Sequence, residues 1–280
     1  MNLSEQLTYS TVLINVKYDN GISGSGTGFI IDFGQNSENF MPVLITNNHV
    51  VENTIETSFE FCKADDNGNP IDTESFLVKV CSNNWIKHPD KDIDLCCLIL
   101  TEILAQLEKD KIEIFFAPIG KELIPSEDVL KKLSAIEDVI MIGYPIGISD
   151  TYNHKPIVRK GITASHPNKK YNGNRETLLD IGSYSGSSGS PVFIFNEGSY
   201  STEEGIFLSS RVYLLGILYG GYIYSANGFL NFEYIPTKIS IKKFFVNLGG
   251  MIKSEAILDF EKIIIDMEKD SNGKNEDGKS

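Results

Sequence analysis

Residues 186–191 have the sequence GSSGSP, in which a serine is flanked by glycines, and they lead into the apolar run VFIF. Such a turn can expose a serine Oγ while the surrounding backbone N–H groups converge on one point. Nucleophilic attack on a carbonyl needs this arrangement, because the oxyanion that forms must meet prepared donors. An ordinary Gly/Ser turn explains the same residues equally well, so the segment needs chemical partners before it indicates catalysis.

A nucleophilic serine needs a base, and the chain contains four histidines. His88 and His166 each precede a proline and His154 lies in a polar stretch, which is typical of solvated turns. His49 follows the apolar run at 43–46 and has apolar neighbours, so its imidazole would be held rigidly. A structural histidine is the alternative at that position. The histidines lack the spacing of metal ligands, so we expect no metal and no cofactor.

A carboxylate must orient that base, and the segment at 88–100 offers Asp90, Asp92 and Asp94. Asp94 opens the uninterrupted apolar strand pattern LCCLIL, which would hold its side chain at the edge of a barrel and partly buried. Asp90 and Asp92 lie further from that run and are expected to be solvated. Asp92 stays open as the alternative, because a shift of two residues keeps a side chain on the same face of a strand.

Short apolar runs separated by glycine- and asparagine-rich turns indicate β-strands in two sets, at 11–100 and at 139–218. Two all-β units fit this pattern as paired small barrels, and a single larger sandwich fits about as well. Other segments have helical or polar patterns, and we expect helices at 102–111, 126–133, 236–248 and 254–267 and a disordered tail at 270–280.

The composition of the 280-residue chain limits the classes of function. Hydrophobic residues make up 41% and charged residues 22%, so a packed core is available. The net charge of −13 argues against nucleic acid or an anionic membrane as a partner. No window approaches the ~18 apolar residues of a membrane span, and the first residues lack the pattern of a secretory signal. The four cysteines show neither the spacing of a disulfide framework nor that of a metal-binding motif. Together these features lead us to expect a cytoplasmic protein.

In their order along the chain, these segments resemble those of trypsin-like (chymotrypsin-fold) serine peptidases of the bacterial intracellular or HtrA-like kind. The resemblance is carried by GSGTGFII at 24–31, TNNHV at 46–50, DLCCL at 94–98, IGYPIG at 142–147 with PIVRKG at 156–161, and GSSGSP at 186–191. The order His, Asp, Ser excludes α/β-hydrolases, in which the order is Ser, Asp, His. The small Cys96 two places after Asp94 is a further reason to prefer Asp94 over Asp92.

The resemblance implies an all-β fold with two packed six-stranded antiparallel β-barrels and a short C-terminal helical segment. It places the first barrel at 1–115, the second at 116–250, and a helix with a disordered tail at 251–280. The site would lie between the barrels, and its substrate would be a protein or peptide.

The resemblance also implies a role for each candidate residue in a serine endopeptidase that works through an acyl-enzyme. Ser188 would be the nucleophile, His49 the base and Asp94 the acid that orients it. The backbone N–H groups of Gly186 and Ser188 would form the oxyanion hole. The alternative is a protease-fold binding module that is non-catalytic or that needs a partner for activation.

The substrate pocket of the family maps by position onto residues that carry no charge. These residues are Gly182, Ser183, Ser185, Tyr219, Gly220 and Gly221. Selection of a basic residue before the scissile bond would need a carboxylate there, so we expect a small or apolar residue at that substrate position. Secreted digestive members carry an aspartate before the nucleophile, where this chain has Ser187. We therefore expect no zymogen cleavage, and control by a partner or by ordering of a loop stays open.

Overall fold

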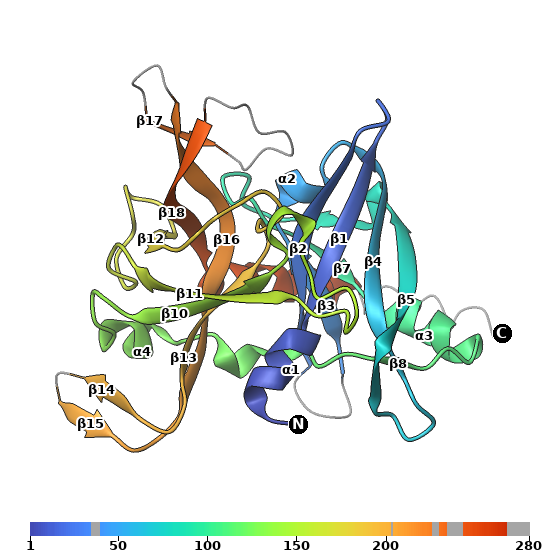
Figure 1. Cartoon of the computed structure of the whole chain (residues 1–280), viewed down its shortest axis with the longest axis horizontal. Helices are drawn as coiled ribbons and strands as arrows, with labels where there is room; N and C mark the ends of the chain where they lie inside the picture. The colour runs from blue at the N-terminus through green and yellow to red at the C-terminus, as the bar shows by residue number, and fades with distance from the viewer. Residues whose placement is uncertain (35–39, 203, 226–229, 234–242, 268–280) are drawn as a thin grey trace.

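The computed structural model of the chain consists mainly of two large β-sheets that lie side by side (Figure 1). It describes residues 1–34, 40–202, 204–225, 230–233 and 243–267. The first sheet has nine strands and the second has seven, and a separate two-stranded hairpin extends from the second.

The first sheet is built from the N-terminal part of the chain. Its strands are β1 Thr11–Tyr18, β2 Ser23–Asp32, β3 Pro42–Thr46, β4 Thr54–Ala64, β5 Pro70–Cys81, β6 Ile86–Lys87, β7 Cys96–Ile99, β8 Ile114–Phe115 and β9 Ile119–Gly120. Seven strands follow the order β5-β4-β1-β2-β3-β7-β6, while β8 pairs with β4 and β9 pairs in parallel with β2. The sequence of β1 alternates between buried and more exposed residues, as a strand with one face in the core requires. Val12, Ile14 and Val16 are buried, and the residues between them are more exposed.

The second sheet closes into a barrel. Its strands are β10 Asp138–Gly143, β11 Ile157–Thr163, β12 Glu176–Asp180, β13 Pro191–Asn196, β16 Arg211–Ser225, β17 Leu230–Glu233 and β18 Lys243–Lys253, and the hairpin strands are β14 Tyr200–Thr202 and β15 Gly205–Phe207. The order β13-β10-β11-β12-β18-β16 returns to β13, so six strands form a closed ring, and β17 pairs with β16 outside it. This ring is the expected six-stranded barrel, whereas the first sheet gains the short strands β8 and β9 from the segment that follows it.

The chain passes from the first sheet to the second through a short helical connection. β9 ends at Gly120 and β10 begins at Asp138, and residues 121–137 between them contain η2 Lys121–Leu123 and α4 Glu127–Lys131. The expected boundary between residues 115 and 116 lies between β8 and β9.

Three of the four segments expected to be helical are helical, and the fourth expectation is contradicted where the structure describes it. α3 Thr101–Lys109 and α4 occupy the segments expected to be helical, and Ser126 accepts a hydrogen bond from the Val129 N–H as the N-cap of α4. The helix expected at 236–248 is contradicted over 243–248, where the chain forms β18 (residues 234–242 lie outside the described part). β18 pairs with both β12 and β16, and hydrogen bonding along both edges outweighs the local helical pattern.

The two ends of the chain also carry short helices. α1 Leu3–Tyr9 begins with a capping box, in which the Asn2 side chain accepts from the Glu5 N–H at 2.9 Å and the Glu5 carboxylate accepts from the Asn2 N–H at 3.0 Å. η4 Ser254–Phe260 continues as α-helix over 261–267, and the tail at 270–280 lies outside the described residues. No helix in the described part is long and apolar enough to cross a membrane.

One apolar cluster joins the two sheets. It includes Phe29 and Ile45 from the first sheet, Phe193 and Leu214 from the second, and Phe260 from η4, and all five side chains are buried. Two further clusters fill the interiors of the separate sheets. Burial of this shared cluster fixes the sheets against each other, so loops at their junction can hold side chains from both.

Candidate active site

His49 lies at the junction between a buried strand and a single helical turn. Every residue of β3 is buried, and α2 Asn48–Val51 begins immediately after Asn47, its N-cap. Val50 and Val51 are also buried, so the backbone on both sides of His49 is anchored in the core. The imidazole itself stays 22% exposed.

Asp94 contacts both the ring and the backbone of His49. Its Oδ2 lies 2.5 Å from Nδ1 of the imidazole, and its Oδ1 accepts from the His49 backbone N–H at 3.0 Å. The Asn47 side-chain amide donates to the Asp94 carbonyl at 2.9 Å, which fixes the backbone of the same residue. A carboxylate at Nδ1 selects the tautomer with its proton on that nitrogen, and Nε2 is then the basic nitrogen.

The structure brings Asp94, and not Asp92, to His49. Asp92 is exposed, and its N–H donates to the Asp90 carboxylate at 3.0 Å in a surface turn. Thr46 at the end of β3 pairs antiparallel with Cys96 at the start of β7. This register places the residues just before β7 opposite the residues just after β3, which explains the contact between Asp94 and His49.

Ser188 lies on a turn between β12 and β13 that is tied to both sheets. Its carbonyl accepts from the Thr27 N–H on β2 at 2.8 Å, and the following Gly189 N–H donates to the Leu218 carbonyl on β16 at 2.8 Å. Its hydroxyl donates to the Tyr219 carbonyl at 3.3 Å. Ser188 is therefore anchored at the junction of the two sheets.

Gly189 lets this turn approach the first sheet closely. It has a φ of +89°, and a Cβ at this position would lie 1.9 Å from the Thr27 carbonyl oxygen and 2.5 Å from Oγ1 of Thr46. Thr46 Oγ1 donates to the same Thr27 carbonyl at 2.7 Å. The Ser188 turn thus lies against the end of β3, from which the chain leads directly to His49.

We expect Gly189→Ala to lower the free energy of unfolding by about 3 kcal/mol or more, because the new methyl group adds overlap with backbone to the strain of a positive φ. Gly198→Ala is the matched control, since Gly198 has a φ of +79° with nothing within 4 Å of an added Cβ. Strain alone should cost this control about 1–2 kcal/mol. Urea denaturation measures both values, and equal losses would contradict the close approach.

Two backbone N–H groups of the Ser188 turn are unused among the described residues. The N–H groups of Gly186 and Ser188 donate to no acceptor within the described part of the chain. The Ile146 N–H donates to the Ser185 carbonyl, and in a planar trans peptide the N–H of the next residue, Gly186, points the opposite way. The expected oxyanion hole needs two donors that are unused in this way.

The residues expected to line the substrate pocket lie on the segment before Ser188 and on β16. A Cβ at Gly221 would lie 3.1 Å from the Ser183 Cβ, and one at Gly249 would lie 2.3 Å from the Ser183 Oγ. Ser183 is buried, so these three residues form one packed group. Gly249 was not predicted, because it comes from β18 and no local motif marks it.

The other expected pocket residues lie close to Ser183 or on β16. Gly182 and Ser185 are buried beside Ser183, and Gly220 is buried on β16. The Tyr219 hydroxyl donates to the Glu176 carboxylate at 2.8 Å, while its carbonyl accepts from the Ser188 hydroxyl. Tyr219 therefore contributes its backbone to the site.

His88 is structural, and the expectation that it lies in a solvated turn is wrong. Its Nε2 lies 3.0 Å from the Ala256 carbonyl oxygen and 3.3 Å from Oδ2 of Asp259, and Phe260 packs edge-on against its ring. All three partners belong to η4, and the His88 side chain is fully buried. No group of three His, Cys, Asp or Glu side chains among the described residues is arranged to hold a metal ion.

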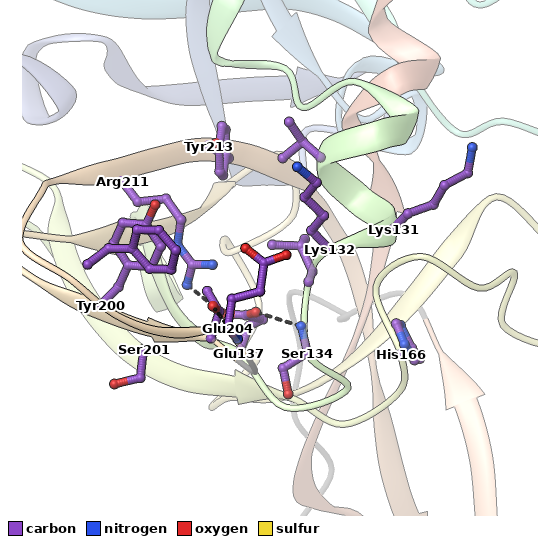
Figure 2. A pocket seen from close by; sticks show the side chains of 14 residues that line it. Lys131, Lys132, Ser134, Glu137, His166, Tyr200, Ser201, Glu204, Arg211 and Tyr213 are labelled. Carbon is purple, nitrogen blue, oxygen red and sulfur yellow. Dashed lines mark hydrogen bonds and ion pairs between the residues drawn. The ribbon is translucent and has the colours of Figure 1, made fainter.

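A cavity of about 590 Å³ lies between α4, the β14–β15 hairpin and the start of β16, and no candidate site residue lines it. Inside it, a nitrogen of the Arg211 guanidinium lies 2.6 Å from Oε2 of Glu137 (Figure 2). Oε1 of Glu137 accepts from the Ser134 N–H at 2.8 Å, and the guanidinium lies over the Tyr200 ring. Both charged side chains are buried, so this pair joins β16 to the start of β10.

Several solved structures match most of the chain at low sequence identity. The HtrA-type protease AlgW with a tripeptide matches with 16% identity and a TM-score of 0.49, over 93% of this chain and 62% of that one. The active form of the Rv3671c protease from M. tuberculosis matches with 13% identity and a TM-score of 0.47, over 91% and 80%. The MamO protease domain from Magnetospirillum magneticum matches with 14% identity and a TM-score of 0.47, over 91% and 97%. The chain thus spans about six tenths of the length of AlgW.

A search of curated proteins found no match. The model of the trypsin-like peptidase domain matches residues 26–199, which include the segments of His49, Asp94 and Ser188. The fold is chymotrypsin-like and all-β, with a closed six-stranded barrel packed against the nine-stranded sheet and a short C-terminal helical segment. Because the match covers more than half of the chain, the protein belongs to the trypsin-like peptidase domain family.

Proposed function

We propose that this protein is a serine endopeptidase that cleaves protein or peptide substrates with Ser188, His49 and Asp94. The observation that carries the proposal is the contact of the Asp94 carboxylate with the His49 imidazole, beside a turn that holds Ser188 between the sheets. Membership of a peptidase family supports the reaction class. An imidazole oriented by a carboxylate is the base that a serine hydroxyl needs for attack on a carbonyl.

In the first step, Ser188 Oγ attacks the carbonyl carbon of the scissile bond while Nε2 of His49 takes the hydroxyl proton. The hydroxyl donates to the Tyr219 carbonyl at 3.3 Å, which is long for such a bond. Rotation about the Cα–Cβ bond of Ser188 therefore redirects the hydroxyl at little cost. Asp94 stabilises the imidazolium that forms and keeps its ring in place.

The tetrahedral intermediate places a negative charge on the former carbonyl oxygen. The N–H groups of Gly186 and Ser188 would donate to that oxygen, and loss of one such donor costs about 10²–10³-fold in kcat. His49 then gives its proton to the leaving amine, the C–N bond breaks, and the acyl group stays on Ser188 as an ester. A water molecule, deprotonated by His49, hydrolyses the ester and restores the hydroxyl.

Ser187 supports activity without cleavage of the N-terminus. Its side chain is fully buried, and its Oγ has no hydrogen-bond partner among the described residues. A neutral hydroxyl at this position cannot form the ion pair with a new N-terminal amine on which zymogen activation depends. We therefore propose that the chain is catalytically competent without zymogen-type cleavage.

Hydrolysis of a long unstructured peptide with both ends blocked tests this proposal. We expect the protein to cleave this peptide at internal bonds while the mass of the protein itself stays unchanged. We also expect an acyl adduct on Ser188 when the reaction with an activated ester is quenched in acid. Ester hydrolysis without peptide cleavage would indicate an esterase instead. A folded protein that hydrolyses neither would be a binding module with a protease fold.

A further inference from the structure

The chain has three arginines, and only one of them lacks an acidic partner in the described structure. Arg175 lies 2.6 Å from a carboxylate oxygen of Asp259, and Arg211 lies 2.6 Å from one of Glu137. Arg159, on β11, makes no ion pair and no hydrogen bond with any described residue. An arginine without a carboxylate is unexpected in a chain with 38 acidic and 25 basic residues.

The guanidinium of Arg159 lies against Gly182, one of the residues expected to line the substrate pocket. A Cβ built on Gly182 would lie 2.0 Å from one terminal nitrogen of Arg159 and 2.6 Å from its Cζ. The guanidinium thus occupies the space that a side chain at position 182 would fill. Its Cζ also lies 4.9 Å from the centroid of the Tyr184 ring, two residues further along the same segment. Gly182 and Tyr184 therefore hold the cation beside Ser183.

A guanidinium held in this way can recognise a carboxylate. It carries five N–H donors in a planar arrangement that matches the two oxygens of a carboxylate. The side chain is half-buried, so its charge is less screened than on an open surface. Asp180, the acidic residue closest to Gly182 along the chain, is exposed and forms no ion pair with Arg159 in the described part. The cation is thus available to a group that arrives with the substrate.

We propose that Arg159 is a specificity-determining residue that selects substrates with Asp or Glu immediately before the scissile bond. This inference rests on the proposed function, because it assigns the substrate class of the same site. It replaces the expectation of a small or apolar residue, which followed from the absence of charge at the expected pocket positions in the sequence. β11 brings a charge to Gly182 from another part of the chain.

The test compares peptides that differ only in charge before the scissile bond. The probes are amidated, acetylated peptides with Glu or Gln at that position, so that no chain-terminal carboxylate competes. We expect kcat/KM to be roughly 10- to 100-fold higher for Glu, as for other hydrogen bonds between charged groups. Arg159→Gln should remove that preference by lowering kcat/KM for the Glu peptide, so that the Glu and Gln peptides are cleaved with similar kcat/KM.

Two variants support the reading of this test. Lys160→Gln is the matched control, because Lys160 is the next residue of β11 and pairs with Asp138 at the surface. It should keep the preference for Glu. Gly182→Ala keeps Arg159 but places a methyl group where the guanidinium lies, so it should weaken the preference without loss of the charge. Thermal melts establish that each variant is folded.

The outcomes separate this inference from the proposed function. Equal kcat/KM for the Glu and Gln peptides in the wild type, or a preference that survives in Arg159→Gln, would overturn the role of Arg159 and leave a serine endopeptidase intact. A folded wild type that cleaves no peptide and is not labelled by a serine-directed phosphonate would overturn the proposed function itself.

Discussion

Ser188→Ala is expected to lower kcat for peptide cleavage by roughly 10⁴-fold or more, because it removes the atom that attacks the carbonyl. Among the described residues the hydroxyl makes one bond, of 3.3 Å, to the Tyr219 carbonyl, so its loss should cost the folded state little. We therefore expect the melting temperature to change by only a few degrees. Initial rates with a blocked peptide and a thermal melt of the same sample measure both quantities.

Ser190→Ala is the matched control for this substitution. Ser190 lies in the same turn, and its Oγ is buried without a hydrogen-bond partner among the described residues. Its removal should leave kcat within a few-fold of the wild type. Retained turnover in Ser188→Ala would show that another group is the nucleophile.

Asp94→Asn is expected to lower kcat by about 10⁴-fold, because the amide cannot hold the required tautomer of His49. Asp94 accepts from the ring at Nδ1 and from the His49 backbone N–H. An asparagine keeps the second bond, but its NH₂ group facing Nδ1 would favour the tautomer with the proton on Nε2. That tautomer cannot accept the proton of the serine hydroxyl.

Asp92→Asn distinguishes between Asp94 and Asp92, which the sequence left as alternatives for the acid that orients His49. Asp92 is exposed in its turn, so the change should leave kcat within a few-fold of the wild type. A large loss in Asp92→Asn with little change in Asp94→Asn would reverse the assignment. Circular dichroism of both variants excludes unfolding as the cause of a loss.

The residues proposed for catalysis could be predicted because each has a local signal. His49 follows an apolar run, Asp94 opens one, and Ser188 precedes one, and these runs form β3, β7 and β13. Strand alternation and turn chemistry act over a few residues, so they are visible in a single sequence. The N-terminal helix had a local signal as well, since Asn2 and Glu5 have the spacing of a capping box.

Contacts between distant segments could not be predicted in this way. Arg159 meets Gly182, and Gly249 meets Ser183, only because β11, β12, β16 and β18 are neighbours in the closed barrel. His88 looked like a turn residue, and η4 from the other end of the chain buries it. Charge and burial at such positions depend on strand order, which no local pattern contains.

Reaction of the purified chain with a fluorophosphonate probe tests the central claim most directly, because the probe traps a serine only when its base and oxyanion donors are in place. The wild type, Ser188→Ala and His49→Ala are compared by in-gel fluorescence, and peptide mapping locates the adduct. We expect labelling of the wild type alone, with the adduct on Ser188. A folded wild type that stays unlabelled, or an adduct on another residue, would contradict a catalytic site built from Ser188, His49 and Asp94.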